Sequence, residues 1–472
     1  MLFNSFEFLF FLPTVFLLYW FVFKKLQHQN VLILLASYVF YGWWDWRFLT
    51  LILLSTVVDY SIGLQMQKNE SQQRRKYLLW VSLAFNLGLL GFFKYYNFFI
   101  DNWIEAWGML GVEMHRSSLQ IILPVGISFY TFQTLSYSID VYRKKLTPTK
   151  NFIAFASFVS FFPQLVAGPI ERATNLLPQF YKQRKFSYDL ASSGIKLILW
   201  GLFKKIVIAD NCAIYVNDIF TNYQDYSSTT LILGAVYFSF QIYGDFSGYS
   251  DIAIGTSRLF GFNLMRNFNY PYFSRDIAEF WRRWHISLST WFRDYVYIPL
   301  GGSRGSKWKQ VRNVFVIFLV SGFWHGANWT FVVWGGLNAL FFIPLLLRNK
   351  NRVHLNVSGE HRFFPSFKEL FQIALTFSLT ALAWVFFRAE NVSVAFDYIR
   401  LIWFNKSNLN HNIWTVNFLI MFFIVIEWFT RKNEVIQIKG KVLNYFFYIV
   451  IMQFILFYAV SNKKVDFIYF QF

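Results

Sequence analysis

The feature that most constrains this chain is a series of uncharged stretches, several of them about 20 residues long. A helix of that length crosses about 30 Å of hydrocarbon, and it satisfies its own backbone polar groups while doing so. With 56% apolar and 23% aromatic residues, the composition is too apolar for a soluble chain of 472 residues. The sequence therefore predicts an all-α, polytopic membrane protein with a single integral-membrane domain over residues 1–472.

Apolar segments separated by charged loops predict about 11–12 transmembrane helices. The expected spans are 6–23, 31–44, 48–64, 77–99, 119–141, 190–209, 229–243, 315–324, 331–347, 371–387, 416–429 and 443–460. Three further apolar segments, 152–169, 252–262 and 286–300, are too short or too broken by proline and glycine to cross, so we expect re-entrant or interfacial helices. Irregular backbone at membrane depth is tolerated only inside protein or beside a wet cavity, and an internal chamber is therefore predicted.

The formal net charge of +19 does not indicate a nucleic-acid partner. The lysines and arginines stand in short clusters at the ends of apolar segments, as the preference of positive charge for the cytoplasmic side of a membrane predicts. The single cysteine, Cys212, excludes an internal disulfide and a site of several thiolates for a metal. We expect neither a metal site nor a nucleic-acid interface.

His325 stands inside an apolar segment, and an ionisable group at membrane depth indicates a functional site. If Arg312 and Asn313 mark the cytoplasmic edge of the helix, a rise of about 1.5 Å per residue places His325 roughly 17 Å into the membrane. The Gly-Ala-Asn sequence that follows should break the helix directly after it. A neutral imidazole there can take a proton from a hydroxyl, as a general base does. The alternative is a structural histidine that bonds a neighbouring helix, with Asn328 as one candidate partner.

A second histidine, His285, follows the sequence Trp-Arg-Arg-Trp at 281–284. The guanidiniums of Arg282 and Arg283 would suit an anionic donor of the phosphate or pantetheine type near the cytoplasmic surface. The alternative is an interfacial anchor, because Trp and Arg commonly mark the headgroup layer without touching a substrate.

Polar residues also gather at 243–251, a segment that contains Asp245, Tyr249, two glycines and two serines. A carboxylate here would orient a histidine or an arginine of a neighbouring element. The alternative is a structural network of Asp and Arg side chains that holds the re-entrant helices together. The sequence contains no P-loop, no G-x-S-x-G and no H-E-x-x-H, so no serine or metal mechanism competes with the histidines.

Four motifs occur in order along the chain: FFPQLVAGPIERA at 161–173, GDFSGYSDIAIG at 244–255, NFNYPYFSRDIAEFWRRWHISLSTWFRDYVYIPLGGSR at 267–304 and GFWHGANWTFVVWG at 322–335. Together with the N-terminal MLFNSFEFLFFLP and the SIDVYR at 138–143, they resemble the membrane-bound O-acyltransferase family. Within it, they resemble the bacterial branch of alginate O-acetylation proteins. The resemblance covers most of the chain through about residue 387, with a family core over about 120–390.

The resemblance implies an O-acyltransferase in which His325 is catalytic and His285 is a second essential residue. It implies a ring of membrane helices around a thin centre, where an outer funnel meets a cytoplasmic entrance. The donor would be acetyl-CoA or another acyl thioester, with no bound cofactor. The acceptor side would hold a glycan or a periplasmic acetyltransferase of the SGNH type, and the location would be the bacterial inner membrane. Residues expected to support the histidines or the donor are Asp245, Tyr249, Trp281, Arg282, Arg283, Trp324 and Asn328, with Asp245 and Asn328 orienting an imidazole.

Three alternatives remain open. A sister branch of the family passes D-alanine to teichoic acids, although the GPIERA element and the length favour O-acetylation of a polysaccharide. A transporter would use the buried histidine as a proton relay, but the chain shows no repeated halves. A scaffold of a polysaccharide export complex would leave both histidines replaceable. The identity of the glycan does not follow from the sequence.

Overall fold

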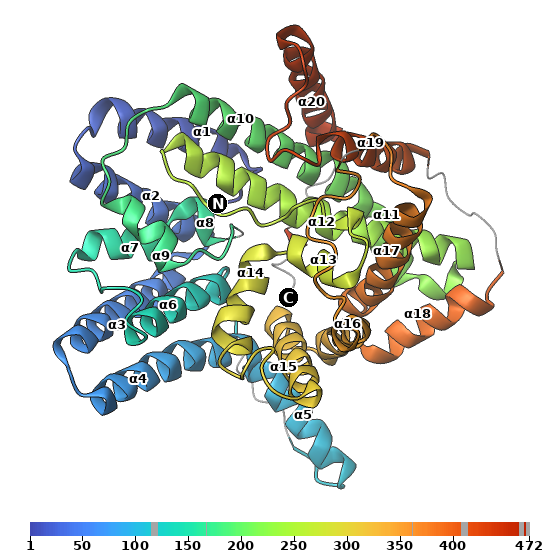
Figure 1. The fold of residues 1–472 in the computed structure, drawn as a ribbon, viewed down its shortest axis with the longest axis horizontal. Coiled ribbons are helices and arrows are strands. Elements are labelled where there is room, and N and C mark those ends of the chain that lie inside the picture. Colours follow the sequence, from blue (N-terminus) through green and yellow to red (C-terminus); the bar gives the residue numbers. More distant parts are fainter. Residues whose placement is uncertain (115–120, 167, 361, 407–413, 462–466, 469–472) are drawn as a thin grey trace. The chain divides into compact units, whose positions relative to one another are not determined.

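The computed structural model describes residues 1–114, 121–166, 168–360, 362–406, 414–461 and 467–468, and within these ranges it contains helices and no strands (Figure 1). Five of its helical stretches are long and apolar enough to cross a membrane: Leu26–Lys68, Gln72–Met109, Trp329–Leu347, Phe367–Arg388 and Lys441–Val460. Shorter apolar helices cover Phe6–Val22, Phe152–Leu165 and Trp414–Thr430. The prediction of an all-α, multi-pass membrane protein is confirmed. The number of crossings and the ring around a funnel stay predictions.

The chain divides into two compact units, each described here by itself. The first unit contains Met1–Gly194 and Ala253–Met265. Its helices are α1 (Phe6–Leu17), α2 (Leu26–Asp45), α3 (Leu49–Lys68), α4 (Gln72–Leu90), α5 (Tyr96–Met109), α6 (Ile127–Tyr142), α7 (Phe152–Ser160), α8 (Phe162–Leu165) and α9 (Ala173–Leu176).

Inside the first unit, α3, α4 and α6 pack around the buried carboxylate of Asp59. Ser82 Oγ, Asn86 Nδ2 and Ser138 Oγ donate to it at 2.5, 2.7 and 2.8 Å. A buried carboxylate accepts several such bonds because each one offsets part of the cost of leaving water. These bonds explain why polar residues interrupt otherwise apolar helices in this unit.

The second unit contains Ile195–Ile252 and Arg266–Phe472. Helices α10 (Tyr188–Leu202) and α12 (Ser228–Leu259) have residues in both units, and the other helices of the second unit are α11 (Asp210–Thr221), α13 (Ile277–Arg283), α14 (Ile286–Phe292), α15 (Lys307–His325), α16 (Trp329–Leu347), α17 (Phe367–Arg388), α18 (Val392–Phe404), α19 (Trp414–Thr430) and α20 (Lys441–Ser461). Helix α12 corrects one expectation, because the segments 229–243 and 252–262 and the polar stretch between them form one helix through Leu259. Lysine partners for its carboxylates and glycines at its close contacts make this possible: a Cβ on Gly248 would lie 2.7 Å from the Gly201 carbonyl oxygen.

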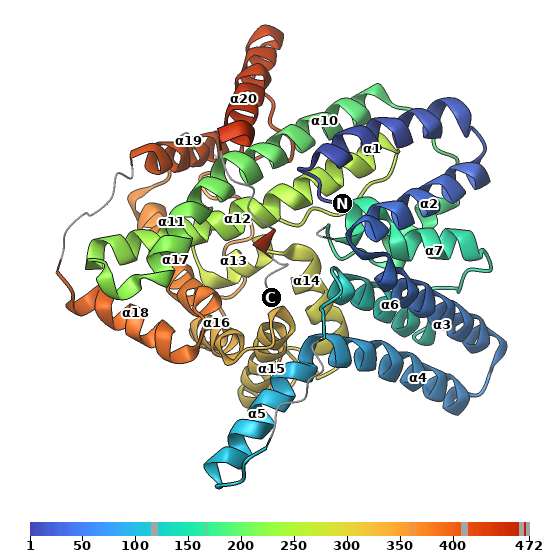
Figure 2. The same ribbon diagram turned by 180° about the vertical axis from the view of Figure 1, so that it is seen from behind.

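Helices α15 and α16 form a hairpin and lie side by side in both views (Figures 1 and 2). Helix α15 ends at His325, and Asn328 then caps α16 by accepting a hydrogen bond from Thr330 N at 3.0 Å. The predicted helix break directly after His325 is therefore confirmed. Two glycines permit the close approach, since a Cβ on Gly322 would lie 2.2 Å from the Phe331 carbonyl oxygen and one on Gly335 would lie 2.4 Å from that of Phe318.

Candidate active site

The second unit brings the two predicted histidines together. The ring centroids of His285 and His325 lie 6.4 Å apart, and the two residues are only 1% and 3% exposed. His325 is the last residue of α15, while His285 caps the N-terminus of α14 with a φ of +43°. A positive φ at a residue other than glycine costs free energy, and such strain is found most often at functional sites.

Asn267 orients the ring of His285. The Asn267 side-chain oxygen lies 3.2 Å from His285 Nδ1 and also accepts from Ser287 Oγ at 2.8 Å. Because this carbonyl oxygen only accepts, the bond places the imidazole proton on Nδ1 and leaves the lone pair on Nε2. Nε2 has no hydrogen-bond partner within the part of the chain that the structure describes. Sequence reasoning missed Asn267, although its place at the start of the 267–304 motif was a signal.

Aromatic rings surround the imidazole of His325. Its ring centroid lies 4.9 Å from that of Trp324, 5.1 Å from Trp334 and 5.4 Å from Phe387. Trp324 also lies 6.2 Å from His285, so it contacts both histidines. These edge-to-face rings exclude water and hold the imidazole plane, and the exclusion of water strengthens any electrostatic interaction made there.

Asp245 and Asn328 do not orient either imidazole as expected. Asp245 pairs with Lys205 at 2.9 Å and accepts from the backbone N of Ile468 at 2.6 Å. Asn328 caps α16 and donates to the carbonyl oxygen of Glu390. The physical reason is that a buried carboxylate forms an ion pair with the nearest cation, while the side-chain oxygen of an Asn before a helix accepts hydrogen bonds from the free amides of the first turn.

A buried charge network accounts for the acids of α12. Lys205 Nζ lies 2.8 Å from Asp210 and 2.9 Å from Asp245, while the neighbouring Lys204 pairs with Asp251 at 2.9 Å. Both lysines belong to a π-helical segment, Phe203–Ala209. The alternative of a structural network of Asp and Arg side chains thus matches the structure, except that lysine stands in place of arginine. Two adjacent lysines in an expected span were the missed signal.

Tyr249 also lies in α12, and its ring centroid lies 4.3 Å from that of Phe467.

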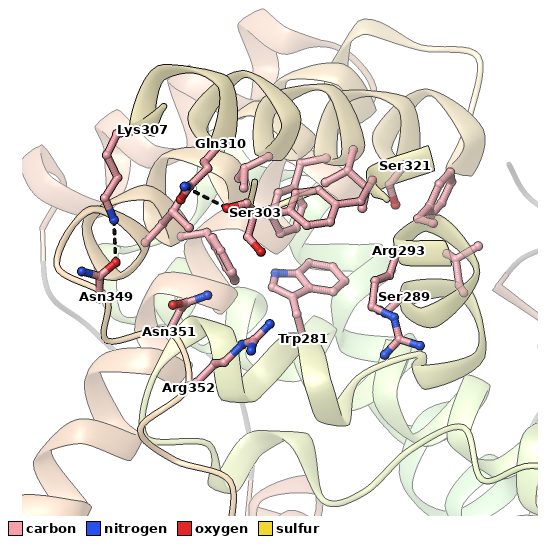
Figure 3. A pocket seen from close by; sticks show the side chains of 18 residues that line it. Trp281, Ser289, Arg293, Ser303, Lys307, Gln310, Ser321, Asn349, Asn351 and Arg352 are labelled. Atoms are coloured by element: carbon pink, nitrogen blue, oxygen red, sulfur yellow. Dashed lines mark hydrogen bonds between the residues drawn. The ribbon is translucent and has the colours of Figure 1, made fainter. Parts of the chain in front are cut away.

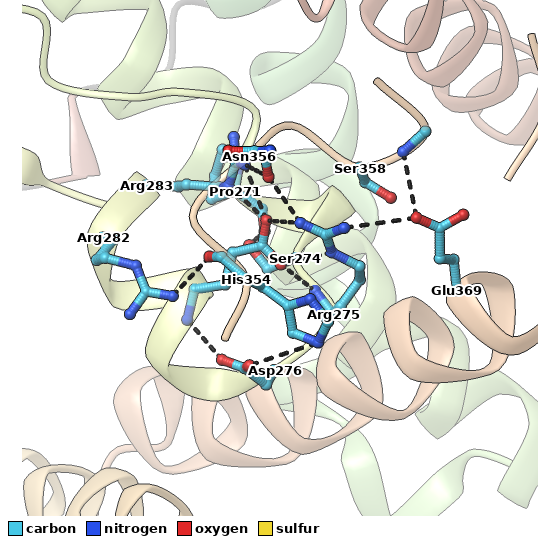
Figure 4. A network of polar contacts seen from close by, with 12 residues as sticks. Pro271, Ser274, Arg275, Asp276, Arg282, Arg283, His354, Asn356, Ser358 and Glu369 are labelled. Atoms are coloured by element: carbon cyan, nitrogen blue, oxygen red, sulfur yellow. Dashed lines mark hydrogen bonds and ion pairs between the residues drawn. The ribbon is translucent and has the colours of Figure 1, made fainter. Parts of the chain in front are cut away.

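The Trp-Arg-Arg-Trp sequence presents its four side chains to different surroundings. Trp281 lines a cavity and donates to Asn338, while Trp284 is buried in the aromatic core. Arg282 donates to backbone carbonyls of the loop after α16, and Arg283 pairs with Glu279 and donates to the same loop (Figure 4). We expected Arg282 and Arg283 to face the donor, but in the structure their guanidiniums contact protein groups instead.

A cavity of about 500 Å³ lies within the second unit, between α14, α15 and α16 (Figure 3). Its walls are mostly apolar, and Figure 3 shows Trp281 at its centre with Arg293, Arg352 and Lys307 around it. Ser321 lines the cavity one helical turn before His325, and Ser289 lines it four residues after His285. A cavity of this size, apolar with a few charged groups, is typical of a small-molecule site. Among the described residues, no group of three or more His, Cys, Asp or Glu could hold a metal ion.

Comparison with known proteins identifies the family. The family model described as MBOAT, membrane-bound O-acyltransferase family, matches residues 33–363. The chain belongs to this family. A probable alginate O-acetylase AlgI of Pseudomonas aeruginosa is 40% identical over 93% of this chain and 84% of its own length. A peptidoglycan O-acetyltransferase of Helicobacter pylori is 35% identical over 87% of this chain and 81% of its own length.

A teichoic acid D-alanyltransferase of Bacillus subtilis is 30% identical over 48% of this chain and 60% of its own length. This membrane-bound O-acyltransferase is therefore an enzyme that acts on an acyl donor, and it is a multi-pass membrane protein, as predicted. The resemblance to alginate O-acetylation proteins is likewise confirmed.

Proposed function

We propose that this enzyme transfers an acetyl group from a cytoplasmic acyl thioester to hydroxyls of an extracytoplasmic polysaccharide, directly or through a periplasmic partner. The coverage of relatives supports acetyl transfer. The O-acetylating relatives align over 84–93% of the chain, whereas the D-alanyltransferase of Bacillus subtilis aligns over 48%. We further propose that the whole chain acts as one membrane domain in a bacterial inner membrane.

The pair of buried histidines carries this proposal. One helical turn separates His325 from the cavity wall at Ser321, and the His285 ring lies 6.4 Å from the His325 ring. Neither histidine is among the residues that line the cavity, so the thioester of a donor held there would extend past Ser289 and Ser321 to reach the imidazoles. A water-poor aromatic surrounding also protects an acyl thioester from hydrolysis.

In the proposed reaction, the His325 imidazole removes the proton of the acceptor hydroxyl as its oxygen attacks the thioester carbonyl carbon. The new C–O bond forms, the C–S bond breaks, and the imidazolium returns the proton to the departing thiolate. No covalent enzyme intermediate is required. Nε2 of His285, held by the Asn267 contact at Nδ1, is the second group available for proton transfer.

The cavity is the proposed donor site. Its apolar walls suit a pantetheine-type arm, and the cations Arg293, Lys307 and Arg352 suit the phosphate groups of acetyl-CoA. Trp281 would contact the arm along its length. Trp324, which touches both histidines, would fix their separation. Asp245, Tyr249 and Asn328 would act as supports of α12 and α16 behind the histidines rather than as contacts of the donor.

The experiment measures ester-linked acetyl on cell-surface and secreted glycans in a deletion strain. The strain is complemented with wild type, His325→Ala, His285→Ala or the control His28→Ala, at equal membrane abundance. His28 is exposed on α2 in the first unit, so its substitution removes a histidine without touching the site. We expect the control to restore acetyl and both site variants to fail. Normal acetyl content in the His325 variant would refute the catalytic role and favour a transporter or a scaffold.

A further inference from the structure

The segment 349–358 after α16, here called the strap, forms one side of the proposed donor cavity. Asn349, Asn351 and Arg352 line the cavity from this segment (Figure 3). Lys307 at the start of α15 donates to the side chain of Asn349 across the same opening. The position of the strap therefore decides the shape of the cavity and the place of the Arg352 cation.

Little apolar burial holds the strap in place. Val353 and Leu355 are 60% and 67% exposed, and the third apolar side chain of the strap, Val357, is only partly buried. Segments with few buried apolar contacts open at low free-energy cost unless hydrogen bonds hold them. The polar contacts of the strap backbone must therefore supply most of its order.

Arg431 Nε donates to Ser358 O at 2.7 Å at the end of the strap, and three further guanidiniums donate to its other carbonyl oxygens (Figure 4). Arg282 Nη1 donates to Asn351 O at 2.7 Å, and its Nη2 donates to His354 O at 2.8 Å. The carbonyl oxygen of Asn356 accepts from two forks, Arg275 Nη2 at 2.6 Å and Arg283 Nη2 at 2.9 Å. Hydrogen bonds from a charged donor are about twice as strong as neutral ones.

Glu279 holds two of the three forks in position. Its carboxylate is buried, at 1% exposure, and it pairs with Arg275 at 3.0 Å and with Arg283 at 2.8 Å. Arg275 also pairs with Glu369 of α17 at 3.4 Å. The buried Glu279 therefore fixes Arg275 and Arg283. The partly exposed Glu369 adds a second contact to Arg275, and the two arginines hold the strap at Asn356.

We propose that Arg275, Arg282 and Arg283 are positioning residues that clamp the strap across the donor cavity, so that Arg352 meets the phosphate groups of the donor. The inference rests on the proposed function, because it assigns the acyl donor to this cavity. The forks of Arg282 bridge two carbonyl oxygens three residues apart, which places its donors on the strap and not in the cavity. The clamp explains why arginine stands at these positions, since an ammonium group cannot span two fixed acceptors in this way.

The test compares substitutions at the clamp and at the cavity in the purified full-length protein. In Arg282→Lys the charge remains but the bridge between two carbonyls is lost, whereas Arg352→Gln leaves the clamp intact and removes a cation from the cavity. Arg400→Lys, on an exposed side chain of α18, is the control. Trypsin cleavage after Lys350 or Arg352 measures strap opening, and Lys350 is the site followed in the Arg352 variant. Titration of the protein with acetyl-CoA gives the dissociation constant for donor binding.

We expect Arg282→Lys to speed strap cleavage and to weaken acetyl-CoA binding on the order of 10-fold, as loss of a charge-assisted bond predicts. We expect Arg352→Gln to weaken acetyl-CoA binding on the order of 10-fold with unchanged cleavage at Lys350, because the cavity loses a cation while the clamp stays intact. Arg400→Lys should match wild type in both measurements. Saturating acetyl-CoA should slow cleavage of the wild-type strap. Arg275→Lys gives a second variant of the clamp should Arg282→Lys fail to fold.

Unchanged cleavage in both clamp variants would overturn the clamp. Faster cleavage with unchanged acetyl-CoA affinity would overturn the positioning role. Failure of the proposed function looks different: wild type would then bind no acetyl-CoA, and the positioning role would fall with it, while the cleavage rates would still decide whether the arginines hold the strap.

Discussion

Gly335 and Gly336 are adjacent in α16, yet they differ in what a methyl group would meet. A Cβ on Gly335 would lie 2.4 Å from the carbonyl oxygen of Phe318 and 3.4 Å from Cα of Leu319, both backbone atoms of α15. A Cβ on Gly336 would meet nothing closer than the Leu319 side chain at 3.9 Å. Gly335→Ala must therefore push α15 and α16 apart, while Gly336→Ala needs no movement.

The magnitude follows from two terms. Both substitutions gain up to about 1 kcal/mol of helix propensity, and this gain cancels in the comparison. Overpacking that forces the neighbouring backbone to shift costs about 1–3 kcal/mol. We expect Gly335→Ala to be less stable than Gly336→Ala by about 1–3 kcal/mol. It should also lose acetyl transfer, because the same hairpin carries His325 at the end of α15.

The assay is unfolding of the two purified variants in graded denaturant within one detergent, with the tryptophan emission as the signal. Acetyl transfer is measured on the same samples below the unfolding range. Equal stability of the two variants would refute the close-contact reasoning. A stable Gly335→Ala protein with full activity would refute the claim that the hairpin spacing positions His325.

Three further outcomes are expected. Asn267→Ala should lower kcat on the order of 100-fold with little change in donor affinity, because His285 loses the acceptor that holds its proton on Nδ1; unchanged kcat would remove Asn267 from the site. Lys205→Met should destabilise the protein by about 3–5 kcal/mol relative to the exposed Lys432→Met, since two buried carboxylates lose their cation; equal stability would show that these acids are held otherwise. Burial lowers the pKa of His354 below its usual 6.5, and the neighbouring Arg275 guanidinium lowers it further. Because protonation of His354 therefore favours the open strap, protection of the strap amides from hydrogen exchange should be complete above about pH 6.5 and should fall as the pH drops below it. Hydrogen exchange of the strap, corrected for its intrinsic rate, should show this loss in wild type and not in His354→Asn.

Hydropathy predicted the fold class, and the reason is physical. Membrane insertion depends on the local sum of transfer free energies over about 20 residues, a quantity that each segment carries by itself. The break after His325 followed in the same way, since Gly326 and an Asn cap act within a few residues of the helix end. Local chemistry also singled out His285, His325 and Trp281, which the structure places at the paired rings and at the cavity.

Partner choice lay beyond local chemistry. Asp245 could have oriented a histidine or paired with an arginine, and only the tertiary structure decided for Lys205, which precedes it by 40 residues in the sequence. The prediction that α12 would be interrupted between 243 and 252 was wrong for the same reason, because the lysines that neutralise its acids lie on another helix.

The sequence by itself determined that the protein is an all-helical, membrane-bound O-acyltransferase and that its polar motifs contain two histidines. Only the tertiary structure decided that these rings lie 6.4 Å apart and that Arg282 reaches strap carbonyls 69 and 72 residues away. Apolar burial is nearly independent of which apolar neighbour is met, so composition predicts it. A hydrogen bond or ion pair depends on an atom being within about 3 Å in the right direction, and that condition exists only once distant segments have packed.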